Sequence, residues 1–130
     1  MSSEPIPHII LTHFKWSLAR LKEAIQNENT EYHRGAALER FRLTYNVALE
    51  TIRAFANEQG QICPTDKSCF EWVREKKWLD KKTNWSNVVA DYKKIQTKQK
   101  NDETEKTYGE LQAHYLLLNH LSQSMTLKKE

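Results

Sequence analysis

The stretch RFRLTYNVALETIRAFANEQG, residues 40–60, decides the fold of this chain. Apolar residues recur in it, and just before it, at spacings of three and four, which places them on one face of an α-helix. Gly60 offers the left-handed backbone conformation that commonly ends a helix, and Pro64 cannot continue one. The pattern predicts a helix that begins at residue 31 or 33 and ends at about residue 58. Its apolar face comprises Leu38, Phe41, Tyr45, Ala48, Leu49, Ile52, Phe55 and Ala56.

Helical spacing also appears on both sides of this segment. A first helix is predicted from residue 8 or 11 to residue 26, and a short one follows a Thr65 cap. A medium helix is predicted from Trp85 to about residue 95, and a long one carries the apolar positions between residues 108 and 125. Between these last two, QTKQKNDETEK contains no apolar residue, which predicts a solvated loop or a frayed helix.

Composition and length indicate one all-α domain over residues 1–130. Hydrophobic residues make up 38% and charged residues 28%, which are globular values, and three Gly with three Pro are few for a turn-rich β protein. Short connections between successive amphipathic helices favour antiparallel neighbours. We therefore predict an up-and-down four-helix bundle with an additional short helix.

The balance of charged residues excludes few classes of binding partner. Twenty Lys and Arg against seventeen Asp and Glu give a net charge of +3, which permits contact with a nucleic acid or nucleotide without the basic cluster that would argue for it. The chain has no apolar window long enough to cross a bilayer, and its N-terminal residues lack the basic start and cleavage site of a secretory signal. We expect a cytoplasmic protein without membrane contact.

Neither the cysteines nor the histidines form a recognisable metal or cofactor motif. Cys63 and Cys69 are separated by five residues, unlike a CxxC redox pair or a zinc knuckle, and we expect ordinary reduced thiols. The five histidines are scattered, and the six-residue step from His114 to His120 places these two on different faces of a helix. We therefore expect neither a metal nor a cofactor.

Several segments in order resemble the nucleotidyltransferase substrate-binding protein family, a branch of the HEPN helical-bundle superfamily. They are LARLKEAIQ, GAALERFRLTYNVALETIRAFANEQG, CPTDKSCFEWVREKKWL and NWSNVVADY, and the resemblance covers about residues 18–97. The positions that fit the family order are Arg40, Phe41, Tyr45, Ala48, Thr51, Arg53, Gly60, Pro64 and Trp85. Those that depart from it are Arg42, Leu43, Asn46, Leu49 and Glu50.

The resemblance implies a homodimeric bundle that works beside a small, separate nucleotidyltransferase. Active HEPN ribonucleases use an Arg-Asn pair and a following His to move a proton and hold a developing negative charge during attack by a ribose 2′-hydroxyl. Aligning on Trp85 and Asp91 places these three positions at Tyr92, Lys93 and Thr97. None of the three carries the required group, so the resemblance implies that the nuclease site is absent and that no residue is catalytic.

A partner or ligand groove is the remaining hypothesis for a site. Arg40, Arg42 and Arg53 either hold a phosphate or an acidic partner surface, or belong to a solvated face paired with glutamates. Tyr45 either lines a ligand pocket or packs in the core. The full candidate set is Arg40, Arg42, Tyr45, Asn46, Arg53, Asp91 and Tyr92. Trp78, between charged segments, is the tryptophan expected to be exposed.

Three functions stay open at this point. The first is a non-catalytic binding subunit that partners a small nucleotidyltransferase, as in a toxin–antitoxin pair, and helps to bind its substrate. The second is a HEPN-type ribonuclease with a displaced active site. The third is a bundle that serves protein interaction alone.

Overall fold

The computed structural model describes residues 6–28, 30–79, 84–96 and 101–129. Within these ranges it has six α-helices and no β-strand. The helices are α1 (Ile6–Gln26), α2 (Glu31–Glu58), α3 (Asp66–Glu75), α4 (Trp85–Ile95), α5 (Asn101–Gly109) and α6 (Leu111–Lys129). The predicted all-α bundle is confirmed.

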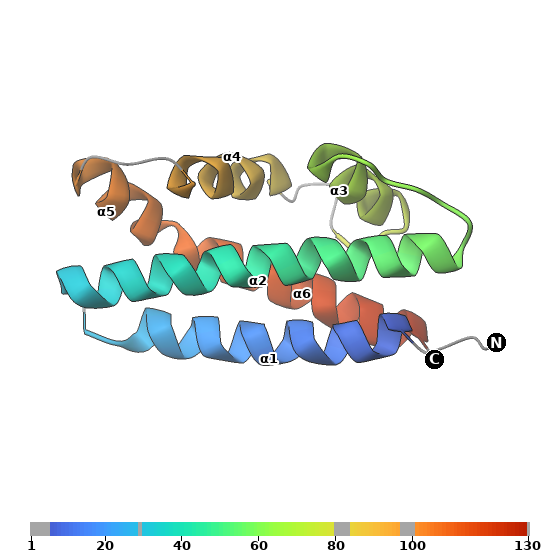
Figure 1. Cartoon of the computed structure of the whole chain (residues 1–130), viewed down its shortest axis with the longest axis horizontal. Coiled ribbons are helices and arrows are strands. Elements are labelled where there is room, and N and C mark those ends of the chain that lie inside the picture. Colours follow the sequence, from blue (N-terminus) through green and yellow to red (C-terminus); the bar gives the residue numbers. More distant parts are fainter. Residues whose placement is uncertain (1–5, 29, 80–83, 97–100, 130) are drawn as a thin grey trace.

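The helices form an up-and-down arrangement around α2 (Figure 1). α1 and α2 run antiparallel and side by side, while α3 and α4 follow one another along a different side of α2. α5 connects α4 to α6, which runs back along α1. Two short helices in line, α3 and α4, thus take the place of the third long helix of a simple four-helix bundle.

Local signals fix where α2 and α3 begin and end. The Thr30 hydroxyl accepts a hydrogen bond from the His33 backbone N–H at the start of α2, and Gly60 has a φ of 76° just beyond its end. Thr65 and Ser68 form a reciprocal capping box at the start of α3. The predicted bounds of α2 and the predicted Thr65 cap are therefore confirmed.

The apolar face of α2 forms the centre of the core. Seven of the eight residues predicted for it are buried, and Leu38 packs partly buried at its edge. α1 contributes the buried side chains Leu11, Phe14, Leu18, Leu21 and Ala24, and α6 contributes the apolar side chains Leu111, Leu118, Leu121 and Met125. No helix in the described residues combines the length and the apolarity that a bilayer span requires.

One helix lies where a solvated loop or a frayed helix was predicted. α5 includes residues 101–106 of the polar stretch QTKQKNDETEK, and residues 97–100 of that stretch lie outside the described ranges. It buries Thr107, and its Glu105 carboxylate lies 3.5 Å from the Arg34 guanidinium of α2. Tyr108, which the spacing assigned to the last helix, belongs to α5 and packs partly buried against the core, and α6 begins at Leu111. The other anchoring side chains of α5, Glu105 and Thr107, are polar, which is why hydrophobic spacing did not separate it from α6.

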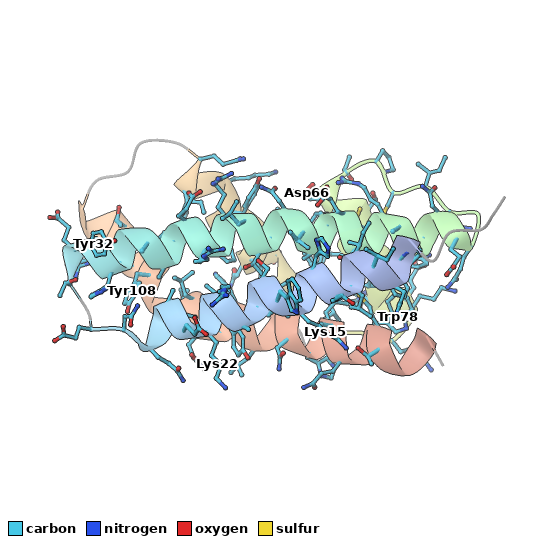
Figure 2. All side chains as sticks on the ribbon, turned by 60° about the horizontal axis from the view of Figure 1, so that its bottom comes forward. Lys15, Lys22, Tyr32, Asp66, Trp78 and Tyr108 are labelled. Atoms are coloured by element: carbon cyan, nitrogen blue, oxygen red, sulfur yellow. The ribbon has the colours of Figure 1, made fainter. Side chains whose placement is uncertain are left out.

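The prediction that Trp78 is exposed is wrong. Its side chain is 2% exposed and packs edge-on against Phe55 and Trp72. Lys77, immediately before it, has a φ of 65°, and this left-handed turn directs Trp78 and Leu79 into the core. Trp78 lies towards the end of the bundle opposite Tyr32 and Tyr108 (Figure 2). The exposed tryptophan is Trp16, on the outer side of α1.

Candidate binding groove

Two tyrosines predicted to belong to the site stack face to face between α2 and α4. The ring centroids of Tyr45 and Tyr92 lie 3.8 Å apart, with 11° between the ring planes. The Tyr92 hydroxyl donates to Asn46 Oδ1 over 2.6 Å and accepts from Gln96 Nε2 over 3.0 Å. The structure therefore brings Tyr45, Asn46 and Tyr92 together, with both aromatic rings buried.

The stack continues into a polar network at the start of α3. The Tyr45 hydroxyl donates to Asp66 Oδ2 over 2.6 Å, and the Arg53 guanidinium lies 3.7 Å from Asp66 Oδ1. Arg53 Nε also donates to the Cys63 carbonyl oxygen over 3.2 Å. Arg53 thus holds the α2–α3 connection and the first turn of α3 against α2.

A buried acid and imidazole pair joins α4 to α6. Asp91 Oδ2 lies 2.7 Å from His114 Nε2, and the two residues are 8% and 3% exposed. The Phe41 ring stacks on the imidazole with 5.2 Å between centroids, and Lys94 Nζ lies 3.7 Å from Asp91 Oδ1. The carboxylate fixes the orientation of the imidazole, which is the arrangement that general bases use in enzymes.

Two adjoining cavities flank this pair. One, of about 390 Å³, is lined by Leu79, Asn84, Asn87, Glu110, Ala113, His114, Leu116, Leu117 and His120. The other, also about 390 Å³, is lined by Asn87, Asp91, Lys94, Lys106, Thr107 and Glu110. Asn87 and Glu110 line both, so the cavities form one depression between α4 and the α5–α6 segment. We name it the α4–α6 groove.

Arg42 lies at a separate cavity on α2. This cavity, of about 260 Å³, is lined by Gly35, Leu38, Glu39, Arg42, Ile95, Thr104 and Thr107. Arg42 Nε donates to Glu39 Oε1 over 3.0 Å, so the pairing with Glu39 that was the alternative interpretation is present. This charge-assisted hydrogen bond from the Arg42 guanidinium lowers the pKa of Glu39 below its usual value.

The three candidate arginines do not share one groove. Arg40 and Arg42 are two positions apart on α2, which separates their side chains by roughly 200° around the helix axis. Arg40 lies on the side of Thr44, whose hydroxyl contacts the Ser17 hydroxyl of α1 over 2.7 Å. Arg53 is committed to Asp66 and the Cys63 carbonyl. Of these three arginines, Arg42 lines the cavity of about 260 Å³, whereas Arg40 and Arg53 line neither that cavity nor the α4–α6 groove.

The groove candidate set did not include His114, although the displaced-ribonuclease alternative placed its catalytic histidine at His114 or His120 on the last helix. A signal was present, because His114 lies three positions after Leu111 and four before Leu118, on the buried face of α6. A histidine at such a position needs a hydrogen-bond partner. What the sequence does not give is which face of which helix supplies that partner, 23 residues away in Asp91.

Stability at alkaline pH is expected to depend on Tyr45. Burial and the Asp66 hydrogen bond raise the pKa of the Tyr45 phenol well above its usual value. Above about pH 10 the unfolded chain releases this proton while the folded chain keeps it, so stability falls as pH rises. The pKa of the buried Cys69 thiol is raised as well, so the comparison is made in a Cys69→Ala background. In that background, Tyr45→Phe should flatten the decline in melting temperature above about pH 10. An unchanged pH profile would contradict the burial of this phenol.

Comparison with models of known protein families and with curated proteins finds no match to this chain.

Proposed function

We propose that this protein is a non-catalytic, homodimeric binding subunit that partners a small nucleotidyltransferase in the cytoplasm and helps to bind its substrate. The proposal rests on the resemblance to the nucleotidyltransferase substrate-binding family and on one observation about Tyr92. The resemblance aligns this position with the arginine of active HEPN ribonucleases. Here the side chain is buried, stacked on Tyr45 and hydrogen-bonded to Asn46. It supports the fold, and it carries no positive charge for a phosphate.

The other two positions aligned with the ribonuclease residues give less support to this proposal. Lys93, aligned with the family asparagine, is exposed on α4, and Thr97 lies outside the described residues. The α4–α6 groove and the Arg42 cavity supply concave, mixed-charge surfaces on the same side of α2 as α4 and α5. Such surfaces suit a polar partner or a nucleotide, because each offers several hydrogen-bond donors and acceptors together with apolar contact area.

Complex formation is tested by co-expression with the small nucleotidyltransferase encoded closest to this chain. We expect the two proteins to co-purify, and Arg42→Glu to weaken the complex about tenfold or more by placing a like charge against an acidic partner surface. Arg20→Glu is the matched control, because Arg20 also pairs with a glutamate three residues away, but on α1. Failure of the wild-type proteins to associate, or equal weakening by both variants, would contradict the proposal.

A ribonuclease with a displaced site is the second candidate, favoured by the Asp91–His114 pair beside the α4–α6 groove. In this alternative His114 accepts the 2′-hydroxyl proton, Asp91 orients the imidazole, and Lys94 and Lys106 face the phosphate charge. We rank it second because His114 is 3% exposed and directs Nε2 at Asp91, leaving little of the imidazole in reach of a substrate.

A further inference from the structure

The two cysteines meet at the connection between α2 and α3. Cys69 Sγ lies 2.7 Å from Cys63 Sγ and 3.3 Å from the Cys63 carbonyl oxygen. The two side chains are 0% and 6% exposed, so the sulfur atoms face one another in a closed environment. A disulfide bond requires a separation of about 2.05 Å, which a small movement of either side chain provides.

The backbone around the pair is held in the position that brings the sulfurs together. Arg53 Nε donates to the Cys63 carbonyl oxygen, which fixes the end of the connection against α2. The Thr65 and Ser68 capping box fixes the first turn of α3, and Cys69 lies on the next position along that helix. The contact between the thiols therefore follows from the backbone arrangement, and oxidation requires no rearrangement of the helices.

We propose that Cys63 and Cys69 form a reversible intramolecular disulfide bond in the folded protein and that this bond locks the α2–α3 connection. The oxidant is a low-molecular-weight disulfide such as oxidised glutathione. This inference is independent of the proposed partner, because it concerns only the thiols of this chain.

The order of the two steps follows from the environment of each thiol. Burial, with a contribution from the Cys63 thiol, raises the pKa of Cys69 to about 12, so Cys69 stays protonated at neutral pH. Cys63 is also the more exposed of the two residues, at 6% against 0%, so Cys63 attacks first. Its neighbour Ile62 is 82% exposed, which places the reagent's approach on the outer side of the connection. Exchange should be slow, because only the thiolate reacts and Cys63 is largely covered.

The exchange balances as two successive thiolate attacks. The Cys63 thiolate attacks one sulfur of oxidised glutathione, forming a mixed disulfide and releasing one glutathione thiolate. Cys69 then loses its proton to solvent and attacks the Cys63 sulfur, forming the intramolecular bond and releasing the second glutathione thiolate. Two electrons pass from the protein thiols to the reagent, and each released thiolate takes up a proton according to its pKa.

The test is incubation of the folded wild-type protein with oxidised glutathione, followed by alkylation in denaturant and mass spectrometry. We expect both thiols to disappear together, with a loss of about 2 Da for the two hydrogen atoms removed. Trypsin cleaves after Lys67, between the cysteines, and should yield peptides 54–67 and 68–74 joined by a bond that a reducing agent breaks. Closing this seven-residue loop should also lower the unfolding equilibrium constant roughly ten- to fifty-fold.

Cys69→Ser and Cys63→Ser are the matched controls, since each leaves one thiol that cannot form the intramolecular disulfide. Three results would overturn the proposal. One is a stable glutathione adduct on wild-type Cys63 without the joined peptides. The second is a disulfide-linked dimer as the main product. The third is full alkylation of both cysteines after prolonged exposure to the reagent.

Discussion

Replacing Phe41 by alanine is expected to lower the free energy of unfolding by about 3 to 5 kcal/mol. The Phe41 side chain is fully buried and packs against two residues of the candidate site, with ring centroids 6.2 Å from Tyr45 and 5.2 Å from His114. Its removal opens a cavity between α2 and α6 that the surrounding rings fill only in part. Because domains of this size are stable by about 5 to 15 kcal/mol, the loss removes a large share of the total.

Thermal and chemical unfolding monitored by circular dichroism measures this loss. Trp16→Ala is the control, since it also removes a large aromatic side chain, but one that is 70% exposed on α1. It should change the free energy of unfolding by no more than about 0.5 kcal/mol. Comparable destabilisation by the two substitutions would contradict the burial pattern that places Phe41 at the centre of the core.

Asp91→Ala is expected to lower the free energy of unfolding by about 2 to 4 kcal/mol, the largest effect after that of Phe41→Ala. The substitution leaves the His114 imidazole without its acceptor in a position that is 3% exposed. Glu110→Ala removes an exposed carboxylate from the same groove and should cost about 0.5 kcal/mol or less.

A double substitution distinguishes the loss of the Asp91–His114 interaction from the loss of side-chain volume. Asp91→Leu together with His114→Leu replaces both polar partners, and it should destabilise the protein less than Asp91→Leu alone, because no buried polar group is left unpaired. Denaturant unfolding of the two single variants and the double variant measures the coupling. Additive losses across this cycle would mean that the two side chains do not stabilise one another.

The main helices could be predicted because their buried apolar residues recur at helical spacing along the sequence. α2 carries an unbroken apolar face with a polar cap before it and Gly60 after it, so its bounds follow from the chain alone. α5 could not be predicted in this way, because its described contacts to α2 include the Arg34–Glu105 ion pair. That pairing depends on where α2 lies in space.

The candidate site was predictable only as separate residues. Tyr45 and Tyr92 were each recognised on a helical face, yet their stacking requires the relative rotation of α2 and α4. The same holds for Asp91, whose partner His114 lies on α6. Trp78 was misjudged because its charged neighbours suggested exposure, whereas the left-handed backbone at Lys77 turns it inward.

A ribonuclease assay on the purified chain tests most directly whether the protein is a non-catalytic subunit. With single-stranded and structured RNA as substrates, we expect cleavage at the background rate, indistinguishable from that of His114→Gln. A general base contributes roughly a hundredfold or more to the rate of such a reaction. Cleavage by the wild-type chain that falls by about this factor in a folded His114→Gln variant would contradict the binding-subunit proposal and locate the catalytic base at the Asp91–His114 pair.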